Sequence, residues 1–247
     1  MLKQVTLAGA LMFPAIAVAQ PIQGLYIGGN AGVSFAGSLL SSQPNRKIYT
    51  DDGPLGLAAV GWGFGNGLRT EIEGSYRSNG IDVISVRRIN GMLEPLTNVS
   101  GNAATYAVMA NVAYDIPLHL PVQPYIGAGL GYGWLNLGNA HGNAPGIFRL
   151  PNNNTIVGPE TVSFGTAGAF AYQAVVGASL PVRAFPGLAF TLEYRFFGMA
   201  GANVPITRAT TTGDLVNGAH PSSTSRNGFN VLDNAVLIGV RYQFRGS

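Results

Sequence analysis

The chain alternates large apolar residues with small or polar residues, with a period of two, over eight separate stretches. A period of two is typical of β-strands, whose successive side chains point to opposite faces of a sheet. The predicted strands lie at residues 25–35, 57–65, 67–76, 105–115, 122–135, 170–180, 188–197 and 235–244. The pattern therefore predicts an all-β chain.

The connections between these stretches alternate strictly between long and short. The long ones are residues 37–54, 79–103, 136–168 and 201–230, and the short ones include Gly65-Asn66-Gly67, a hairpin signal. In an up-and-down arrangement, this alternation places every long loop at one end of the molecule and every short turn at the other. Such asymmetry is typical of bacterial transmembrane β-barrels, so the sequence predicts an eight-stranded antiparallel transmembrane β-barrel.

The two faces of the predicted strands differ in a way that orients the barrel. In the stretch 122–135, one face carries Ile126, Leu130 and Trp134, whereas the other carries Gln123 and four alternate glycines. A soluble barrel with this pattern would bury the bulky face and cover its surface with glycine. In a membrane barrel the bulky face meets lipid, and the small, polar face fits the narrow lumen. We therefore expect the bulky face outside.

Every ionisable residue in the interior of these strands lies in the polar phase. They are Arg69, Glu71, Glu73, Arg77, Glu193, Arg195 and Arg241. An arginine facing the bilayer midplane would cost about 2–4 kcal/mol, which supports a lumenal position for the whole set. The third and seventh strands lie four apart in an eight-stranded ring, so their charges would face each other across the lumen. We predict a lumenal network of ion pairs, with either a structural role or a gating role.

Aromatic residues concentrate near the ends of the predicted strands. They are Tyr26, Trp62, Tyr76, Tyr106, Tyr114, Tyr132, Trp134 and Tyr172. Aromatic rings are enriched where a membrane-spanning segment crosses the membrane–water interface. We predict that these side chains form interfacial girdles around the barrel.

The first twenty residues have the composition of an export signal. Lys3 precedes an apolar run, and Ala17-Val18-Ala19 forms a small-x-small cleavage site before Gln20. We therefore predict a signal peptide over residues 1–19 and a barrel domain over residues 20–247. The chain has no cysteine, only 10% charged residues and a formal net charge of +3, so neither a disulfide framework nor a nucleic-acid partner is expected.

Several sequence blocks occur in a characteristic order: "GLYIGGNAGVSF", "GLRTEIEGSYR", "VQPYIGAGLGYGW", "FAYQAVVGASLPV" and "AVLIGVRYQF". On these blocks the chain resembles the small outer-membrane β-barrel family of Gram-negative bacteria, which includes the OmpA-type barrel, opacity proteins and surface-antigen porins. The resemblance implies an outer-membrane location, with lipid and lipopolysaccharide as its surroundings. It also implies recognition by the barrel-assembly machinery, because Tyr242 and Phe244 match an aromatic-terminated last strand.

Candidate chemistry for catalysis or metal binding is sparse. The three histidines, His119, His141 and His220, lie in turns or long connections without a local nucleophile or metal-ligand motif. The glycine runs "GWGFGNG" and "GAGLGYG" have a period of two and no following helix, which argues against nucleotide-binding loops. We predict a protein that is not an enzyme and that has no cofactor, metal site or catalytic residue. The alternative is a rim site in which His141 and His220 meet.

Three functions fit these features. The leading hypothesis is a structural or surface-exposed barrel whose specificity lies in its four long loops. A second is a narrow porin for small solutes, which requires the lumenal charges to rearrange. A third is an adhesin whose long loops bind an unknown surface ligand. Basic residues in these loops would pair with lipopolysaccharide phosphates; they are Arg46, Lys47, Arg87, Arg88 and Arg149.

Overall fold

The structure is a computed structural model that describes residues 21–41, 46–87, 93–118, 120–138, 140–149, 155–210 and 222–244. The strands are β1 (Gln23–Ser41), β2 (Arg46–Thr50), β3 (Gly53–Phe64), β4 (Leu68–Arg87), β5 (Leu93–Pro95), β6 (Thr97–Ser100), β7 (Asn102–Asp115), β8 (Gln123–Asn136), β9 (His141–Arg149), β10 (Thr155–Phe164), β11 (Thr166–Pro181), β12 (Leu188–Thr210) and β13 (Ser222–Gln243). None of the described residues lies in a helix long and apolar enough to cross a membrane. The predicted signal peptide, residues 1–19, lies outside the described residues.

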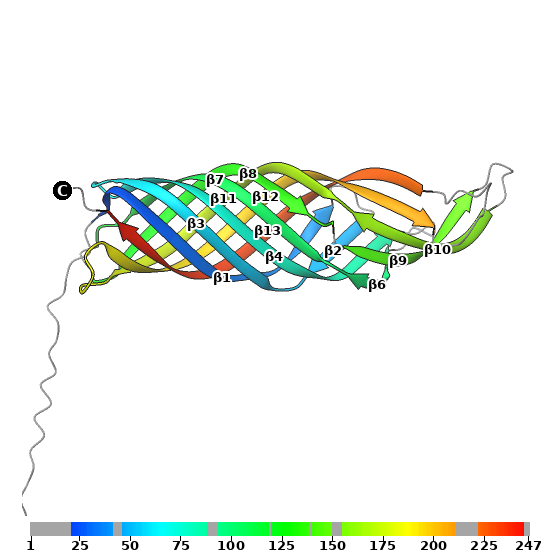
Figure 1. The fold of residues 1–247 in the computed structure, drawn as a ribbon, viewed down its shortest axis with the longest axis horizontal. Coiled ribbons are helices and arrows are strands. Elements are labelled where there is room, and N and C mark those ends of the chain that lie inside the picture. The colour runs from blue at the N-terminus through cyan, green and yellow to red at the C-terminus, as the bar shows by residue number, and fades with distance from the viewer. Residues whose placement is uncertain are drawn as a thin grey trace, which may run out of the picture.

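Eight of the strands close into a ring. β1, β3, β4, β7, β8, β11, β12 and β13 pair antiparallel in this order, and β13 pairs with β1. Figure 1 shows the resulting cylinder, with short turns at one end and long connections at the other. In the turn between β3 and β4, Gly65 and Gly67 have φ of 77° and 93°, which glycine adopts without strain. The predicted eight-stranded, up-and-down antiparallel barrel is confirmed.

The ring closes with a stagger along the strands. A path that starts at Gly24 of β1 and steps from each residue to its pairing partner on the next strand returns to β1 at Ser34, ten residues further along. The residues on this path are Gly24, Gly63, Arg69, Ala113, Gly127, Val175, Arg195, Ala235 and Ser34. Such a stagger requires the strands to tilt relative to the barrel axis, typically by about 35–45°. Directly paired residues therefore lie at different depths, and side chains that meet inside the barrel need not be pairing partners.

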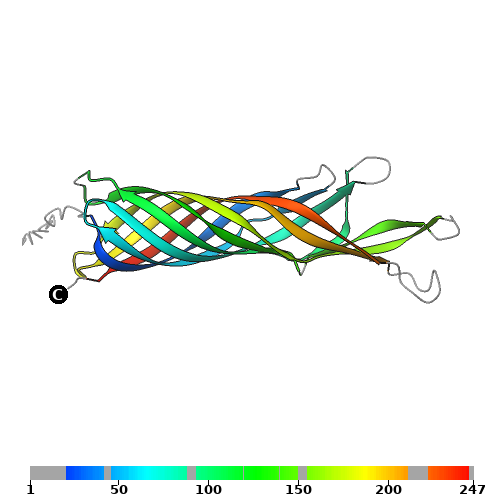
Figure 2. The same cartoon turned by 90° about the horizontal axis from the view of Figure 1, so that it is seen from above.

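The long connections consist largely of strands. β4 continues to Arg87 and β12 to Thr210, well past their predicted ends. At the same end of the barrel, β2 pairs with β1 and β4, β5 with β4, β6 with β9, and β10 with β9 and β12. We call this part of the barrel, seen from a second side in Figure 2, the extension.

The predicted strand ends were therefore wrong, and on β1 and β12 β-bulges explain why. The register shifts between Phe35 and Ser38 on β1, and between Met199 and Ala202 on β12. Each bulge adds one residue and moves the following side chains to the opposite phase. On these two strands the alternation breaks where the extension begins, so a search for continuous alternation ends them too early.

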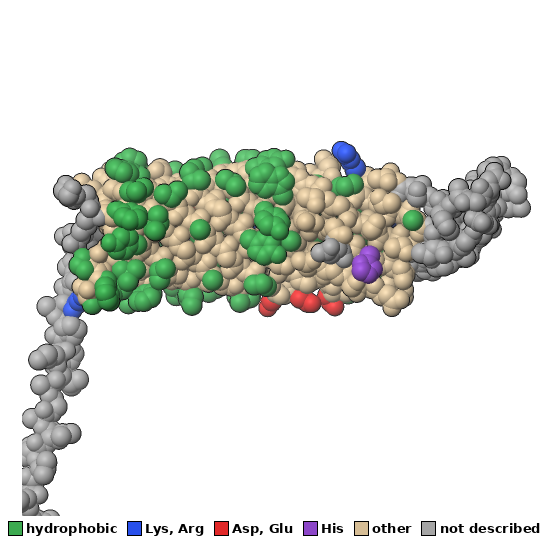
Figure 3. Space-filling view, in the orientation of Figure 1, with side chains coloured by type: hydrophobic (Ala, Val, Ile, Leu, Met, Phe, Trp, Pro, Cys, Tyr) green, Lys and Arg blue, Asp and Glu red, His purple; other side chains and the backbone are tan. Residues whose placement is uncertain are grey.

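The outer wall of the ring strands is apolar. Its large side chains are between 46% and 69% exposed at Ile27, Val60, Ile72, Val112, Leu130, Val176, Leu192 and Ile238. We call this wall the lipid belt. Figure 3 shows hydrophobic side chains gathered in two bands over the part of the cylinder nearer the short turns. An apolar surface that encircles the whole barrel identifies the membrane-spanning section.

In the extension, the apolar side chains point inward instead. The inner wall is lined by a packed group of buried residues, the extension core, which includes Ile48, Ile84, Leu135, Leu137, Val162, Phe197, Met199, Val204, Ile206 and Phe229. The outer wall exposes polar residues such as Asp51, Asp82, Asn98, Ser100, Asn203 and Arg226. Water surrounds the extension, so burial of apolar surface favours an apolar interior there. The apolar side chains therefore face outward in the lipid belt and inward in the extension.

We expect Phe229→Ala to destabilise the folded barrel by about 3–5 kcal/mol, because it removes a fully buried ring and leaves a cavity in the extension core. Urea titration of the protein refolded in lipid vesicles, followed by tryptophan fluorescence, measures the loss. Phe229→Leu is the matched control and should cost less than about 1.5 kcal/mol, since it keeps most of the volume. Unchanged stability of Phe229→Ala would contradict a packed extension core.

Candidate functional site

Charged side chains gather inside the ring of strands, so the lumen is the candidate functional site. In the first cluster, Arg69 Nε lies 3.1 Å from Asp115 Oδ1, and Arg69 Nη1 pairs with Glu71. The Tyr26 hydroxyl donates to Glu71 Oε1 at 2.7 Å. The Arg69 guanidinium carbon lies 4.4 Å from the ring centroid of Tyr125. Arg69 is the second residue of β4 and Asp115 is the last of β7, so this cluster lies next to the short turns.

A second cluster joins opposite walls of the barrel. Arg195 of β12 lies 2.5 Å through Nη1 from Glu73 Oε2 of β4, and 2.7 Å through Nε from Glu193 Oε2. Gln173 donates to Glu73 Oε1 at 3.2 Å, and the Tyr125 hydroxyl donates to Glu193 Oε1 at 2.6 Å. All three charged residues are buried. Because β4 and β12 are four strands apart in the ring, these contacts cross the whole lumen.

A third cluster borders the extension core. Arg77 Nη1 lies 2.9 Å from Asp233 Oδ2, and the Ser34 hydroxyl donates to Asp233 Oδ1 at 2.7 Å. The Arg77 guanidinium carbon lies 3.7 Å from the ring centroid of Phe197, where the aromatic face stabilises the cation. Together with Asn79, these polar residues line a cavity of about 20 Å³, which has room for about one water molecule.

Arg241 stands apart from these three clusters. Its Nη2 donates to Ser179 Oγ at 3.1 Å. Its guanidinium carbon lies 5.9 Å from the ring centroid of Tyr26 and 5.8 Å from that of Tyr125. Within the described part of the chain, no carboxylate forms an ion pair with it. The two tyrosine rings also contact Arg69, so their faces accommodate two neighbouring cations.

The structure places every residue of the predicted lumenal network on the inner wall, and it brings most of them into ion pairs. Two acids that the sequence analysis left out, Asp115 and Asp233, complete the clusters. Among the described residues, four arginines therefore share the lumen with five carboxylates. Asp233 lies just before the predicted start of the last strand. Continuing the alternation backwards from Arg241 through Ala235 would have included it.

Tyr26 does not belong to an interfacial girdle. Its side chain is only 1% exposed and points into the lumen. There it lies across Gly61, at which a Cβ atom would collide with the tyrosine ring, and Tyr125 lies across Gly177 in the same way. The prediction for Tyr26 was wrong because phase, and not distance from the strand end, decides which wall a side chain faces.

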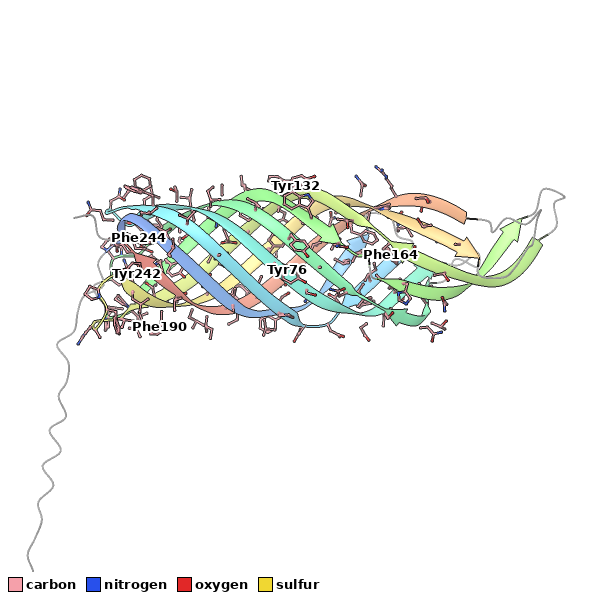
Figure 4. All side chains as sticks on the ribbon, viewed as in Figure 1. Tyr76, Tyr132, Phe164, Phe190, Tyr242 and Phe244 are labelled. Carbon is pink, nitrogen blue, oxygen red and sulfur yellow. The ribbon has the colours of Figure 1, made fainter. Side chains whose placement is uncertain are left out.

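The other predicted interfacial aromatics lie on the lipid belt in two groups. Trp62 and Tyr114 lie at the short-turn end, and the group nearer the extension consists of Tyr76, Tyr106, Tyr132, Trp134 and Tyr172. The ring centroids of Tyr76 and Tyr106 are 4.9 Å apart, and those of Tyr132 and Trp134 are 5.1 Å apart. Figure 4 shows Tyr76 and Tyr132 at the edge of the belt nearer the extension, and Phe190, Tyr242 and Phe244 at the edge nearer the short turns.

The rim holds little of the predicted candidate chemistry. His141 Nε2 lies 2.9 Å from Ser100 Oγ, and these two exposed residues are directly paired across β6 and β9, which accounts for the contact. His119 and His220 lie outside the described residues, as do the side chains of the predicted loop cations Arg46, Lys47, Arg87, Arg88 and Arg149. Across the described ranges, no three His, Cys, Asp or Glu residues are placed to hold a metal ion.

An eight-stranded barrel with an apolar outer wall and an ionic lumen defines a transmembrane β-barrel of the outer-membrane class. The chain belongs to the outer membrane protein beta-barrel domain family, whose model matches residues 5–244. An "Outer membrane protein" of Gluconacetobacter diazotrophicus is 34% identical over 214 residues, which cover 85% of this chain and 51% of that protein. The chain thus spans about half the length of this curated relative. The predicted family and outer-membrane location are confirmed.

Solved structures share the fold. The crystal structure of the outer membrane protein OprG from Pseudomonas aeruginosa is 11% identical with a TM-score of 0.53, covering 93% of this chain and 100% of that chain. A major outer membrane protein from Thermus thermophilus is 16% identical with a TM-score of 0.50, covering 89% of this chain and 99% of that chain. At these identities the likeness extends to the fold alone.

We expect Arg195→Gln to destabilise the barrel by about 3–5 kcal/mol, because Glu73 and Glu193 would remain buried without their shared cation. Urea titration in lipid vesicles measures the change. Arg183→Gln, at an exposed position in the turn between β11 and β12, is the control and should stay within about 0.5 kcal/mol of the unchanged protein.

Adding Glu73→Gln to Arg195→Gln should recover part of the lost stability, since it removes one of the two uncompensated charges. The central cluster would have no stabilising role if Arg195→Gln cost no more than Arg183→Gln.

Proposed function

We propose that the protein is a closed, non-enzymatic outer-membrane barrel that presents its extension at the cell surface, in a structural or surface-interaction role. The observation that carries this proposal is the filling of the lumen in two successive sections. Ionic clusters and a small buried apolar cluster of Leu55, Leu57, Ala235 and Leu237 fill the section inside the lipid belt, and the extension core fills the section beyond it. A solute would have to displace both.

The central cluster supports permanent closure. Arg195 is shared by Glu73 and Glu193, and both carboxylates also accept hydrogen bonds from neutral side chains. Asn111 of β7, Gln173 of β11 and Tyr125 of β8 are these neutral donors. Separating a buried cation from its carboxylates costs several kcal/mol in low-dielectric surroundings. A network with partners on five strands therefore favours a fixed filling over a gate.

The extension core argues against the narrow-porin hypothesis. Its side chains are apolar, so an exchange of ion-pair partners in the lumen would not open it. Opening would instead expose buried apolar surface to water, which is unfavourable in proportion to the exposed area. Conduction would thus require two unrelated rearrangements in series.

In planar lipid bilayers, we expect flat current traces for the purified protein. Arg195→Gln alone should also give flat traces, because the extension core still blocks the lumen. Combining Arg195→Gln with Phe229→Ala and Ile206→Ala weakens the filling of both sections and should produce current steps. Heat-modifiable gel mobility confirms that each variant is folded. Reproducible steps from the unchanged protein would overturn the closed-barrel proposal in favour of a porin.

The β9–β10 hairpin favours a role in surface interaction. β10 pairs with β9 from Thr155 to Ser163, but with β12 only from Glu160 to Phe164. The hairpin consequently projects beyond the rest of the extension, as Figure 1 shows. Projecting segments on a rigid scaffold are suited to binding. A surface ligand, or lipopolysaccharide phosphates bound by the loop cations, would be reached from this end.

The last strand supports delivery by the barrel-assembly machinery. Tyr242 and Phe244 both face the lipid belt, and their ring centroids are 5.2 Å apart. Both rings are therefore available to a partner that binds the outer wall of β13 before the barrel closes.

The proposed orientation is testable on whole cells. An epitope inserted between Asn152 and Asn153, in the connection from β9 to β10, should bind antibody on intact cells, because long connections of such barrels face the exterior. An epitope inserted at Asn66 should bind antibody only after the outer membrane is permeabilised. Heat-modifiable mobility again serves as the folding control. The opposite labelling pattern would show that the extension faces the periplasm.

A further inference from the structure

The lipid belt contains a groove that spans β1, β3, β4 and β7. Its volume is about 400 Å³, and the larger side chains around it are Leu25, Val60, Trp62, Ile72 and Val112. Thr70 and Ala110 also line the groove, and their short side chains leave the space open. Thr70 is the third residue of β4, so the groove lies towards the short-turn end of the belt.

Strand register sets the shape of this groove. Trp62 pairs with Thr70, and Thr70 pairs with Val112, so that these three residues form one row across the wall. In the next row, Ile72 pairs with Ala110. Thr70 and Ala110 thus lie beside large side chains that are about half exposed, and the space above these two residues forms one continuous groove.

Thr70 and Trp62 bring polar groups to the lining of this largely apolar space, whereas the lining residues Glu71 and Asn111 have their polar groups bonded in the lumen. Within the described part of the chain, neither the Thr70 hydroxyl nor the Trp62 indole N–H has a hydrogen-bond partner. At one other position on the belt the chain supplies the partner itself, since the Tyr194 hydroxyl donates to Asn234 Oδ1 at 2.7 Å. A hydroxyl or N–H without a partner is costly in hydrocarbon. The groove therefore lacks an acceptor that a bound molecule would supply.

We propose that the groove binds one glycerophospholipid from the membrane leaflet at the short-turn end. An acyl chain lies along the groove, and an ester carbonyl oxygen accepts a hydrogen bond from the Thr70 hydroxyl. The groove is continuous with the lipid belt, so an acyl chain enters it without leaving the membrane. Tryptophan side chains prefer the headgroup level of the bilayer, where acyl esters also lie. A phospholipid supplies both the apolar chain and the missing acceptor.

The chain has two tryptophans, which makes this site directly measurable. In Trp134→Phe, the remaining tryptophan fluorescence comes from Trp62 in the groove. In Trp62→Phe, it comes from Trp134, at the edge of the belt nearer the extension. The probe is phosphatidylethanolamine with brominated acyl chains, titrated into the full chain refolded in detergent micelles. We expect the quenching of Trp62 to saturate near one lipid per protein. The quenching of Trp134 should rise in proportion to the brominated fraction without saturation.

Two substitutions in the Trp134→Phe background separate shape from hydrogen bonding. Thr70→Val keeps the shape and removes the hydroxyl, so the half-quenching concentration should rise about 2- to 10-fold, the effect of one lost hydrogen bond. Thr70→Phe fills the groove and should abolish the saturable phase. Ala174→Phe is the matched control, because it adds the same ring to the belt on β11, away from the groove, and should leave the titration unchanged.

Heat-modifiable mobility shows whether each variant is folded, and Thr70→Val decides the test should Thr70→Phe fail to refold. The proposal is overturned if Trp62 quenching does not saturate, or if Thr70→Phe and Thr70→Val both titrate like Ala174→Phe. A cross-linked dimer that Thr70→Phe removes, together with unsaturable lipid quenching, would instead assign the groove to a second copy of the chain.

Discussion

In hydrocarbon no water is available to backbone N–H and C=O groups, so each membrane-spanning strand needs a partner on both edges. The pairing of β13 with β1 meets this requirement by closing the sheet. Closure with eight strands leaves a lumen narrow enough for side chains to fill. Inward residues must then be small or have partners of their own. The glycines beneath the rings of Tyr26 and Tyr125, and the three ionic clusters, are two consequences of that single requirement.

The surrounding medium changes along the barrel, and the side-chain pattern changes with it. In the lipid belt the apolar residues face outward, and the polar ones meet each other in the lumen. In the extension the apolar residues turn inward to form a core, because water replaces lipid as the outer medium. β-Bulges on β1 and β12 shift the phase at the boundary without interrupting strand pairing. One continuous barrel can therefore have an outer wall that suits lipid in one section and water in the next.

In the closed barrel that we propose, the filled lumen leaves function to the outer surfaces. The extension has polar outer walls and a projecting hairpin, whereas the belt has a groove with two unpartnered donors. Inside the barrel, Arg195 is held between Glu73 and Glu193 and ties opposite walls of the cylinder together.

The alternation of residues was sufficient to predict the number of strands in the ring, the outward face and the inward position of Arg69, Glu73 and Arg195, because a period of two is a local property of the chain. Partners were decided only by the tertiary structure. The stagger of the closed ring brings Arg195 to Glu73 on the opposite wall, yet brings Arg241 to two tyrosines and no described carboxylate. The extension likewise depended on pairing between distant strands, since its bulges break the local pattern. Sequence by itself thus determined which wall each side chain faces, and closure of the barrel decided what it meets there.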